Sequence, residues 1–115
     1  MSITIYHNPR CSKSRQTLQL LQDKGIEPTI VEYLKTQPDA DTLDKILTML
    51  NVEPRDLMRK QEAEYKAQGL NDESLSREQL IKAMTEHPKL IERPIVVTDG
   101  RAAIGRPPEN VMEIL

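Results

Sequence analysis

The order of apolar and polar residues at the start of the chain changes from the two-residue period of a strand to the longer period of a helix. The β-branched run Ile3 to Tyr6 predicts a strand, and the leucines that follow predict a helix that begins near Cys11 and ends at Gly25. A second strand is predicted at Thr29 to Leu34. Strand, helix and strand within about 35 residues predict a βαβ unit with parallel strands and a right-handed crossover.

The middle of the chain has the spacing of amphipathic helices. Four apolar residues recur at helical intervals, namely Leu43, Ile46, Leu47 and Leu50. Asp39 or Asp41 is expected to cap this helix, and Pro54 fits the first position of a short second one. A capping box at Ser76 to Gln79 predicts a third helix, which His87–Pro88 ends. We therefore expect the middle segment to be a helical insertion.

The C-terminal part returns to the pattern of strands. The compact apolar run Pro94 to Val97 predicts a strand, Asp99–Gly100 predicts a two-residue hairpin turn, and "RAAIG" predicts the returning antiparallel strand. Two prolines end that strand, and "PENVMEIL" predicts a final helix. The order is βαβ, helical insertion, ββα, which indicates an α/β fold with a mixed four-stranded sheet.

Length and composition narrow the class of protein. A chain of 115 residues suits a single domain spanning 1–115, with the helical insertion at about 38–88. The formal net charge of -2 gives no reason to expect a nucleic-acid partner or binding to an anionic membrane. No apolar run approaches the roughly 18 residues of a membrane span, and the first residues do not read as a signal peptide. A cytoplasmic monomer with no metal and no tightly bound cofactor is expected.

Cys11 is the only cysteine, so it cannot form a disulfide within the chain. It is either an inert buried thiol or a reactive one, and its polar and basic neighbours favour the reactive one. At the first turn of a helix, unpaired backbone N–H groups and the helix dipole stabilise a thiolate or a bound oxyanion. His7 can donate to the sulfur or hold a positive charge near it, and Ser14 can direct its hydroxyl back toward it. Each of these effects lowers the thiol pKa.

The stretch from Cys11 to Ser14 is a CxxC motif in which serine replaces the second cysteine. Without that resolving thiol, the protein cannot close an internal disulfide as a dithiol oxidoreductase does. Any redox cycle must therefore use an external thiol.

Three later segments place an arginine in a setting that suits anion binding. Arg59 ends an apolar helical turn, Arg93 directly precedes a proline that leads into a strand, and Arg106 follows the last strand. Each of them is also compatible with a solvated surface arginine. Arg93 and Arg106 lie at opposite ends of one predicted hairpin. We therefore expect them to meet and to grip a tetrahedral oxyanion through bidentate hydrogen bonds.

Four stretches of the sequence resemble one known family: "IYHNPRCSKSR", "LMRKQE", "RPIVV" and "GRPPE". They resemble the ArsC-type arsenate reductases, which are glutaredoxin-linked oxidoreductases of the thioredoxin fold. The resemblance extends over nearly the whole chain. It implies a thioredoxin-like fold with a helical insertion, in agreement with the order of elements read from the pattern.

The resemblance also implies a chemistry. Cys11 would be the nucleophile that attacks arsenate, glutathione would attack the resulting adduct as co-substrate, and glutaredoxin would complete reduction to arsenite, as in arsenic detoxification. Arsenate binding is implied for three arginines: Arg59, Arg93 and Arg106. The resemblance further implies that His7 and Ser14 keep the sulfur ionised, and that the peptide bond before Pro94 is cis.

Two other functions remain open at this stage. One is a glutathione-dependent thiol reductase that acts on mixed disulfides at the same site. The other is a binding module, as in distant relatives that bind RNA polymerase and regulate transcription. Those regulators typically carry a CxxC switch where this chain has Ser14, and the thiol reductases tend to lack the His-Asn-Pro lead-in. Both differences favour arsenate reductase.

Overall fold

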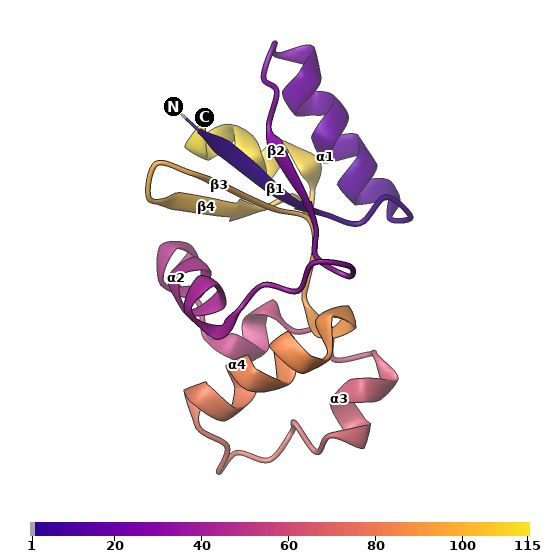
Figure 1. Cartoon of the computed structure of the whole chain (residues 1–115), viewed down its shortest axis with the longest axis vertical. Helices are drawn as coiled ribbons and strands as arrows, with labels where there is room; N and C mark the ends of the chain where they lie inside the picture. Colours follow the sequence, from indigo (N-terminus) through magenta and orange to yellow (C-terminus); the bar gives the residue numbers. More distant parts are fainter. Residues whose placement is uncertain (1) are drawn as a thin grey trace. The chain divides into compact units, whose positions relative to one another are not determined.

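The computed structural model describes residues 2–115 (Figure 1). Its contacts divide the chain into two compact units. The sheet unit comprises the residues up to Thr36 together with Arg93–Leu115, and the helical unit comprises Gln37–Glu92. No helix among the described residues is long and apolar enough to cross a membrane.

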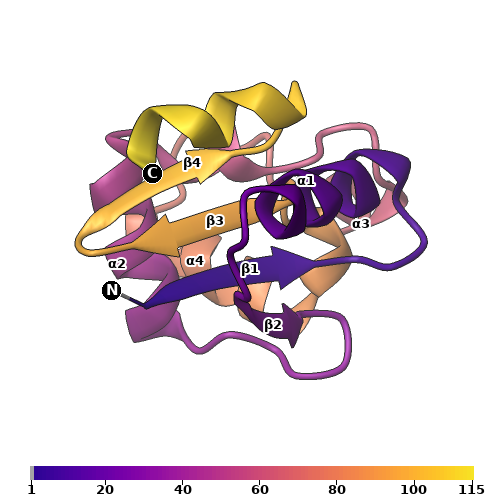
Figure 2. The same ribbon diagram turned by 90° about the horizontal axis from the view of Figure 1, so that it is seen from above.

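The sheet unit is built on four strands, which are β1 (Ile3–His7), β2 (Thr29–Glu32), β3 (Ile95–Thr98) and β4 (Arg101–Ile104). Their order across the sheet is β2-β1-β3-β4, as Figure 2 shows. β1 pairs parallel with β2 and antiparallel with β3, and β3 pairs antiparallel with β4. This arrangement confirms the predicted α/β class, the mixed four-stranded sheet and the βαβ start.

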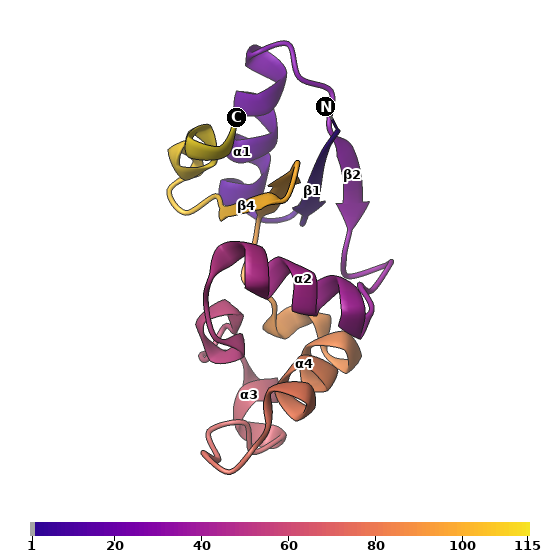
Figure 3. The same cartoon turned by 90° about the vertical axis from the view of Figure 1, so that its left-hand side faces the viewer.

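One face of this sheet is covered by α1 (Ser12–Asp23) and by the C-terminal η3 (Pro108–Ile114), which lie on the same side of the strands in Figure 3. The buried core between them consists of Ile3, Ile5, Leu21, Val96, Val111 and Ile114. Burial alternates along β1, so His7 shares the face of Ile3 and Ile5 toward α1. The final helix is a 3₁₀ helix.

The turn between β3 and β4 has the predicted two residues. Thr98 pairs with Arg101, and Asp99 and Gly100 both have positive φ, of 44° and 78°. Two successive left-handed residues give the turn the twist of the flanking strands, which is why Asp-Gly is favoured there. The hairpin prediction is confirmed.

The second predicted strand is too long by two residues. β2 ends at Glu32, because the N–H groups of Lys35 and Thr36 both donate to the Glu32 carbonyl oxygen at 2.9 Å and turn the chain. Leu34 therefore lies in a turn and is 38% exposed. The apolar pattern of the sequence does not predict this turn, because the turn is made by backbone hydrogen bonds and not by side chains.

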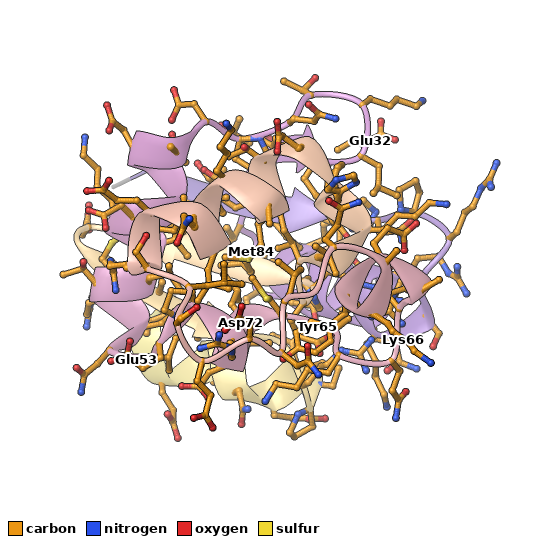
Figure 4. All side chains as sticks on the ribbon, turned by 90° about the horizontal axis from the view of Figure 1, so that it is seen from below. Glu32, Glu53, Tyr65, Lys66, Asp72 and Met84 are labelled. Carbon is orange, nitrogen blue, oxygen red and sulfur yellow. The ribbon has the colours of Figure 1, made fainter. Side chains whose placement is uncertain are left out.

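The helical unit contains three α-helices and two 3₁₀ helices: α2 (Ala40–Leu50), η1 (Pro54–Leu57), α3 (Ala63–Ala67), α4 (Arg77–Glu86) and η2 (Pro88–Leu90). The predicted apolar face of α2 is buried through Leu43, Ile46 and Leu47. Met84 of α4, labelled in Figure 4, is fully buried. Each such side chain contributes roughly 1.5–3 kcal/mol by leaving water.

The ends of these helices follow the capping signals in the sequence. Asp39 accepts a hydrogen bond from the N–H of Thr42 at 2.8 Å, so it caps α2. Ser76 and Gln79 form the predicted capping box of α4. α3 was not predicted, because none of its residues is buried and it therefore carries no apolar stripe.

Candidate active site

The turn after β1 delivers Cys11 to the start of α1. The N–H of Cys11 donates to the carbonyl oxygen of Asn8 at 3.0 Å, and the side-chain oxygen of Asn8 accepts from the N–H of Arg10 at the same distance. Cys11 itself has an extended backbone and occupies the N-cap, where its carbonyl oxygen accepts the first helical hydrogen bond, from Arg15. The thiol therefore lies at the positive end of α1.

The surroundings of the sulfur favour its ionised form. Cys11 is 8% exposed, and burial by itself raises the thiol pKa. The backbone N–H groups of Ser14 and Lys13 and the charges of Arg93 and Arg106 act in the opposite direction, and the net result is a lowered pKa. The side chain makes no formal capping hydrogen bond, so the stabilisation comes from these groups together.

Two arginines of the sheet unit, Arg93 and Arg106, act on the thiol. Nη2 of Arg106 lies 3.6 Å from Sγ of Cys11, and its Nε donates to the backbone carbonyl oxygen of Arg93 at 2.8 Å. The carbonyl oxygen of Arg106 in turn accepts from the side-chain amide of Asn110 at 3.0 Å. Both guanidinium groups thus act on one sulfur, an arrangement suited to an anion that the thiolate attacks.

The position of Arg106 depends on the residue before it. Gly105 donates its N–H to the carbonyl oxygen of Pro94 at 2.9 Å. A Cβ at this position would lie 2.5 Å from Oγ1 of Thr17 and 2.8 Å from Cγ of Pro94. Only glycine lets the end of β4 pass this close to α1. Sequence reasoning missed this role, although the glycine between a strand and "RPP" was the available signal.

Two peptide bonds in this region are cis, Arg93–Pro94 and Arg106–Pro107. The first is the bond for which the family resemblance implied a cis proline. The second was not anticipated.

His7 and Ser14 form a buried pair beneath the turn. Oγ of Ser14 lies 2.6 Å from Nδ1 of His7 and accepts the N–H of Asn8 at 3.0 Å. Burial lowers the pKa of His7, the nearby Glu32 carboxylate raises it, Arg15 lowers it, and the net direction is downward. The ring is therefore neutral near pH 7, and its Nδ1 shares a hydrogen bond with the Ser14 hydroxyl.

This arrangement differs from the expected contacts of His7 and Ser14 with the sulfur. The Ser14 hydroxyl is hydrogen-bonded to His7 and to the N–H of Asn8. It is therefore the backbone N–H of Ser14, and not the side chain, that acts on Cys11. Within residues 2–115 no hydrogen bond joins His7 to the sulfur. The pair instead fixes the turn that carries the thiol.

Arg59 lies in the helical unit. Its N–H donates to the carbonyl oxygen of Leu90 at 2.7 Å, beside a β-bridge between Met58 and Ile91. Its guanidinium forms an ion pair with Glu62. The candidate residues that the structure brings together are thus those of the sheet unit. Across the described chain, no group of three or more His, Cys, Asp or Glu residues is arranged to hold a metal ion.

Known proteins and one family model match nearly the whole length of this chain. The model of the ArsC family matches residues 6–114. A protein of Escherichia coli K12 that carries the name "uncharacterized protein YfgD" is 57% identical over 114 residues, which are 98% of this chain and 96% of that protein. An arsenate reductase of Haemophilus influenzae is 50% identical over 116 residues, covering 100% of both chains.

A solved structure has the same fold over the same length. The arsenate reductase from Vibrio cholerae superposes with a TM-score of 0.97 at 53% identity, covering 100% of this chain and 98% of that one. The family match and this similarity both span the thiol turn, the helical insertion and the arginines of the last hairpin. The chain therefore belongs to the ArsC family and has its thioredoxin-like α/β fold.

Proposed function

We propose that this protein is an arsenate reductase. The observation that carries the proposal is the lowered pKa of a thiol at a helix N-terminus, with a guanidinium nitrogen of Arg106 3.6 Å from its sulfur. A nucleophilic sulfur and an anion-binding arginine at that separation suit attack on a tetrahedral oxyanion. Relatives named arsenate reductase, at 45–50% identity over nearly the whole chain, support arsenate as that oxyanion.

The first step forms a bond between Cys11 and arsenic. The Cys11 thiolate attacks the arsenic(V) centre, the S–As bond forms, and one As–O bond breaks, with the oxygen leaving as water after protonation. Arg93 and Arg106 neutralise the oxyanion as it binds and as its charge redistributes. Arsenate binding by Arg59 remains a prediction from the family resemblance, and its guanidinium forms an ion pair with Glu62.

The remaining steps require two external thiols, because the chain has one cysteine. Glutathione attacks arsenic, and a second oxygen leaves as water. A glutaredoxin thiolate then attacks the glutathione sulfur, and the electron pair of the As–S bond passes to arsenic, which becomes arsenic(III). That attack releases the glutaredoxin–glutathione disulfide, and water then displaces Cys11 from arsenic and releases arsenite. This thiol chemistry suits the reducing cytoplasm.

His7 and Ser14 have a positioning role in this scheme. The 2.6 Å contact between them and the hydrogen bond from Asn8 hold the turn in the shape that places Cys11 at the N-cap. They keep the sulfur ionised indirectly, because the N–H groups of α1 act on it only in that position.

The test is a turnover assay with purified protein. Arsenate, glutathione, glutaredoxin, glutathione reductase and NADPH are mixed, and arsenate-dependent NADPH oxidation and arsenite formation are measured together. We expect both, with one arsenite per NADPH. If arsenite does not form while the protein reduces glutathione mixed disulfides, the protein is a thiol reductase and the proposal is wrong.

A further inference from the structure

A cavity of about 300 Å³ lies beside the turn that carries Cys11, within the sheet unit. Its lining comes from two segments far apart in sequence, the turn after β1 and the turn after β2: His7, Asn8, Pro9, Arg10, Glu32, Leu34 and Lys35. Glu32, labelled in Figure 4, is the last residue of β2 and is the register partner of His7. This volume is at the low end of the range for small-ligand sites.

The cavity is lined by charged residues of both signs. Arg10 and Lys35 supply two cations, and Glu32 supplies one carboxylate, 3.6 Å from the Lys35 ammonium. The complementary ligand therefore carries two anionic groups and one cationic group. Glutathione has that pattern at neutral pH, with two carboxylates and one ammonium. A tetrahedral oxyanion such as arsenate has no cation to match Glu32.

The uncharged part of the lining also suits a small peptide. Leu34 is a large apolar residue that remains 38% exposed, and Pro9 lines the same cavity. His7 is only 6% exposed, and its Nδ1 is hydrogen-bonded to Ser14, so Nε2 is the ring nitrogen that remains for a ligand. The cavity thus offers apolar contact for methylene groups and a hydrogen bond for a peptide group.

The cavity is close enough to serve the thiol. Cys11 follows Pro9 by two residues, which span at most about 7 Å of backbone. A tripeptide spans about 10 Å on the same scale. A ligand with one end among Arg10 and Lys35 can therefore present its central cysteine to arsenic bound on Cys11.

We infer that this cavity is the binding site for glutathione, with its carboxylates at Arg10 and Lys35 and its ammonium at Glu32. The inference rests on the proposed function for the choice of glutathione as the co-substrate. It assigns that co-substrate a site separate from the arginines that face the sulfur. It also explains how a chain with one cysteine selects a particular thiol.

The test uses no arsenate, so its outcome is separate from that of the turnover assay. Cys11 is converted to a neutral 2-thiopyridyl mixed disulfide, and thiols are added. A thiolate attacks the Cys11 sulfur, a new S–S bond forms, and 2-thiopyridone leaves and is measured by absorbance. Rates with glutathione and with glutathione monoethyl ester are compared, each divided by its rate with a free 2-thiopyridyl disulfide.

We expect the wild-type protein to prefer glutathione over its ester about fivefold to tenfold, since the ester lacks one carboxylate. Lys35→Glu should remove most of this preference, Arg10→Gln should reduce it, and Lys24→Glu should leave it unchanged. Lys24 is an exposed residue outside the cavity. Comparing the two thiols on one protein cancels any effect of a substitution on Cys11 itself.

A wild-type ratio of one would overturn the site altogether. A preference that survives Lys35→Glu and Arg10→Gln would mean that glutathione binds elsewhere on the protein. In either case, arsenate turnover with glutathione would still leave the proposed function standing. Conversely, a preference that follows these substitutions would hold even if arsenate were not reduced.

Discussion

At both Cys11 and His7, burial and a neighbouring group of opposite charge shift the pKa in opposite directions, but the outcome differs between the two residues. Both side chains flank one turn and are almost equally buried, at 8% and 6% exposure. Burial disfavours the charged form of each. At Cys11, two arginines and two backbone N–H groups outweigh burial, so the thiol pKa falls. At His7, burial prevails over the nearby Glu32 carboxylate, so the ring stays neutral.

Because the two side chains are almost equally buried, the difference between them comes from the number and charge of their neighbours. In the proposed reaction the anion is the sulfur of Cys11, and the cations that lower its pKa are Arg93 and Arg106. The neutral imidazole contributes no positive charge of its own and shares a hydrogen bond with the Ser14 hydroxyl. A site of this kind can bind an oxyanion and ionise a thiol with the same arginines.

We expect the largest loss of activity when the thiol of Cys11 is removed. Cys11→Ser keeps the size of the side chain but replaces the thiolate with a neutral hydroxyl. Arsenate reduction should fall by at least about a thousandfold, because nucleophile and electron path are both lost. Steady-state turnover measures this, and the melting temperature should stay near that of the wild type. Retained activity would rule out Cys11 as the nucleophile.

The next effect comes from removing a cation that offsets burial. Arg106→Ala should raise the pKa of Cys11 and weaken arsenate binding by roughly 1.5–3 kcal/mol, or about 10- to 150-fold in KM. Arg106→Lys should keep most of the pKa effect but lose the bidentate contact. Arg101→Ala, at an exposed position on β4, is the matched control. Equal KM values in Arg106→Ala and Arg101→Ala would contradict this assignment.

A smaller loss of arsenate binding is expected when Arg106 is displaced but not removed. Gly105→Ala creates the contact with Thr17 and Pro94, which should cost about 1–3 kcal/mol of stability and raise the KM for arsenate severalfold. Thr17→Ala removes both Thr17 atoms that crowd the new Cβ, so the double variant should recover part of both losses. Urea unfolding and KM measurements follow the two effects. No coupling between the substitutions would show that this contact does not position Arg106.

The smallest expected effect is on the pH dependence of stability, and it comes from His7. The pKa of His7 is lower in the folded protein than in the unfolded chain, so the unfolded chain takes up the proton first as pH falls. The stability that His7 contributes is complete above about pH 6.5 and is lost below it. His7→Asn should therefore flatten the dependence of the urea midpoint on pH between 7.5 and 5. An unchanged dependence would mean that His7 is not the group responsible.

Much of the fold could be predicted from local patterns in the sequence. The apolar spacing of Leu43, Ile46 and Leu47, the capping box at Ser76 and the Asp99–Gly100 turn each encode their structure within a few residues. The position of Cys11 at a helix start follows from the same kind of local signal. α3 could not be found this way, since no residue of it is buried.

The rest of the site depends on contacts between distant segments. Pattern alone does not show that Gly105 passes against Thr17, or that Lys35 of the turn after β2 lines the same cavity as Arg10. The same limit explains the error at Ser14, whose hydroxyl was expected to reach the sulfur. Its spacing from Cys11 is correct for a helical contact, but His7 takes up that hydroxyl from another element.

We propose that the groups that bind the oxyanion are the same groups that lower the pKa of Cys11. The rate of Cys11 alkylation by iodoacetamide, measured across pH with and without arsenate, tests it most directly, with phosphate as a second tetrahedral anion. We expect an apparent pKa clearly below the value of about 8.5 for a free cysteine, and protection by arsenate that weakens in Arg106→Ala. A pKa near 8.5 with no protection by arsenate would contradict the account.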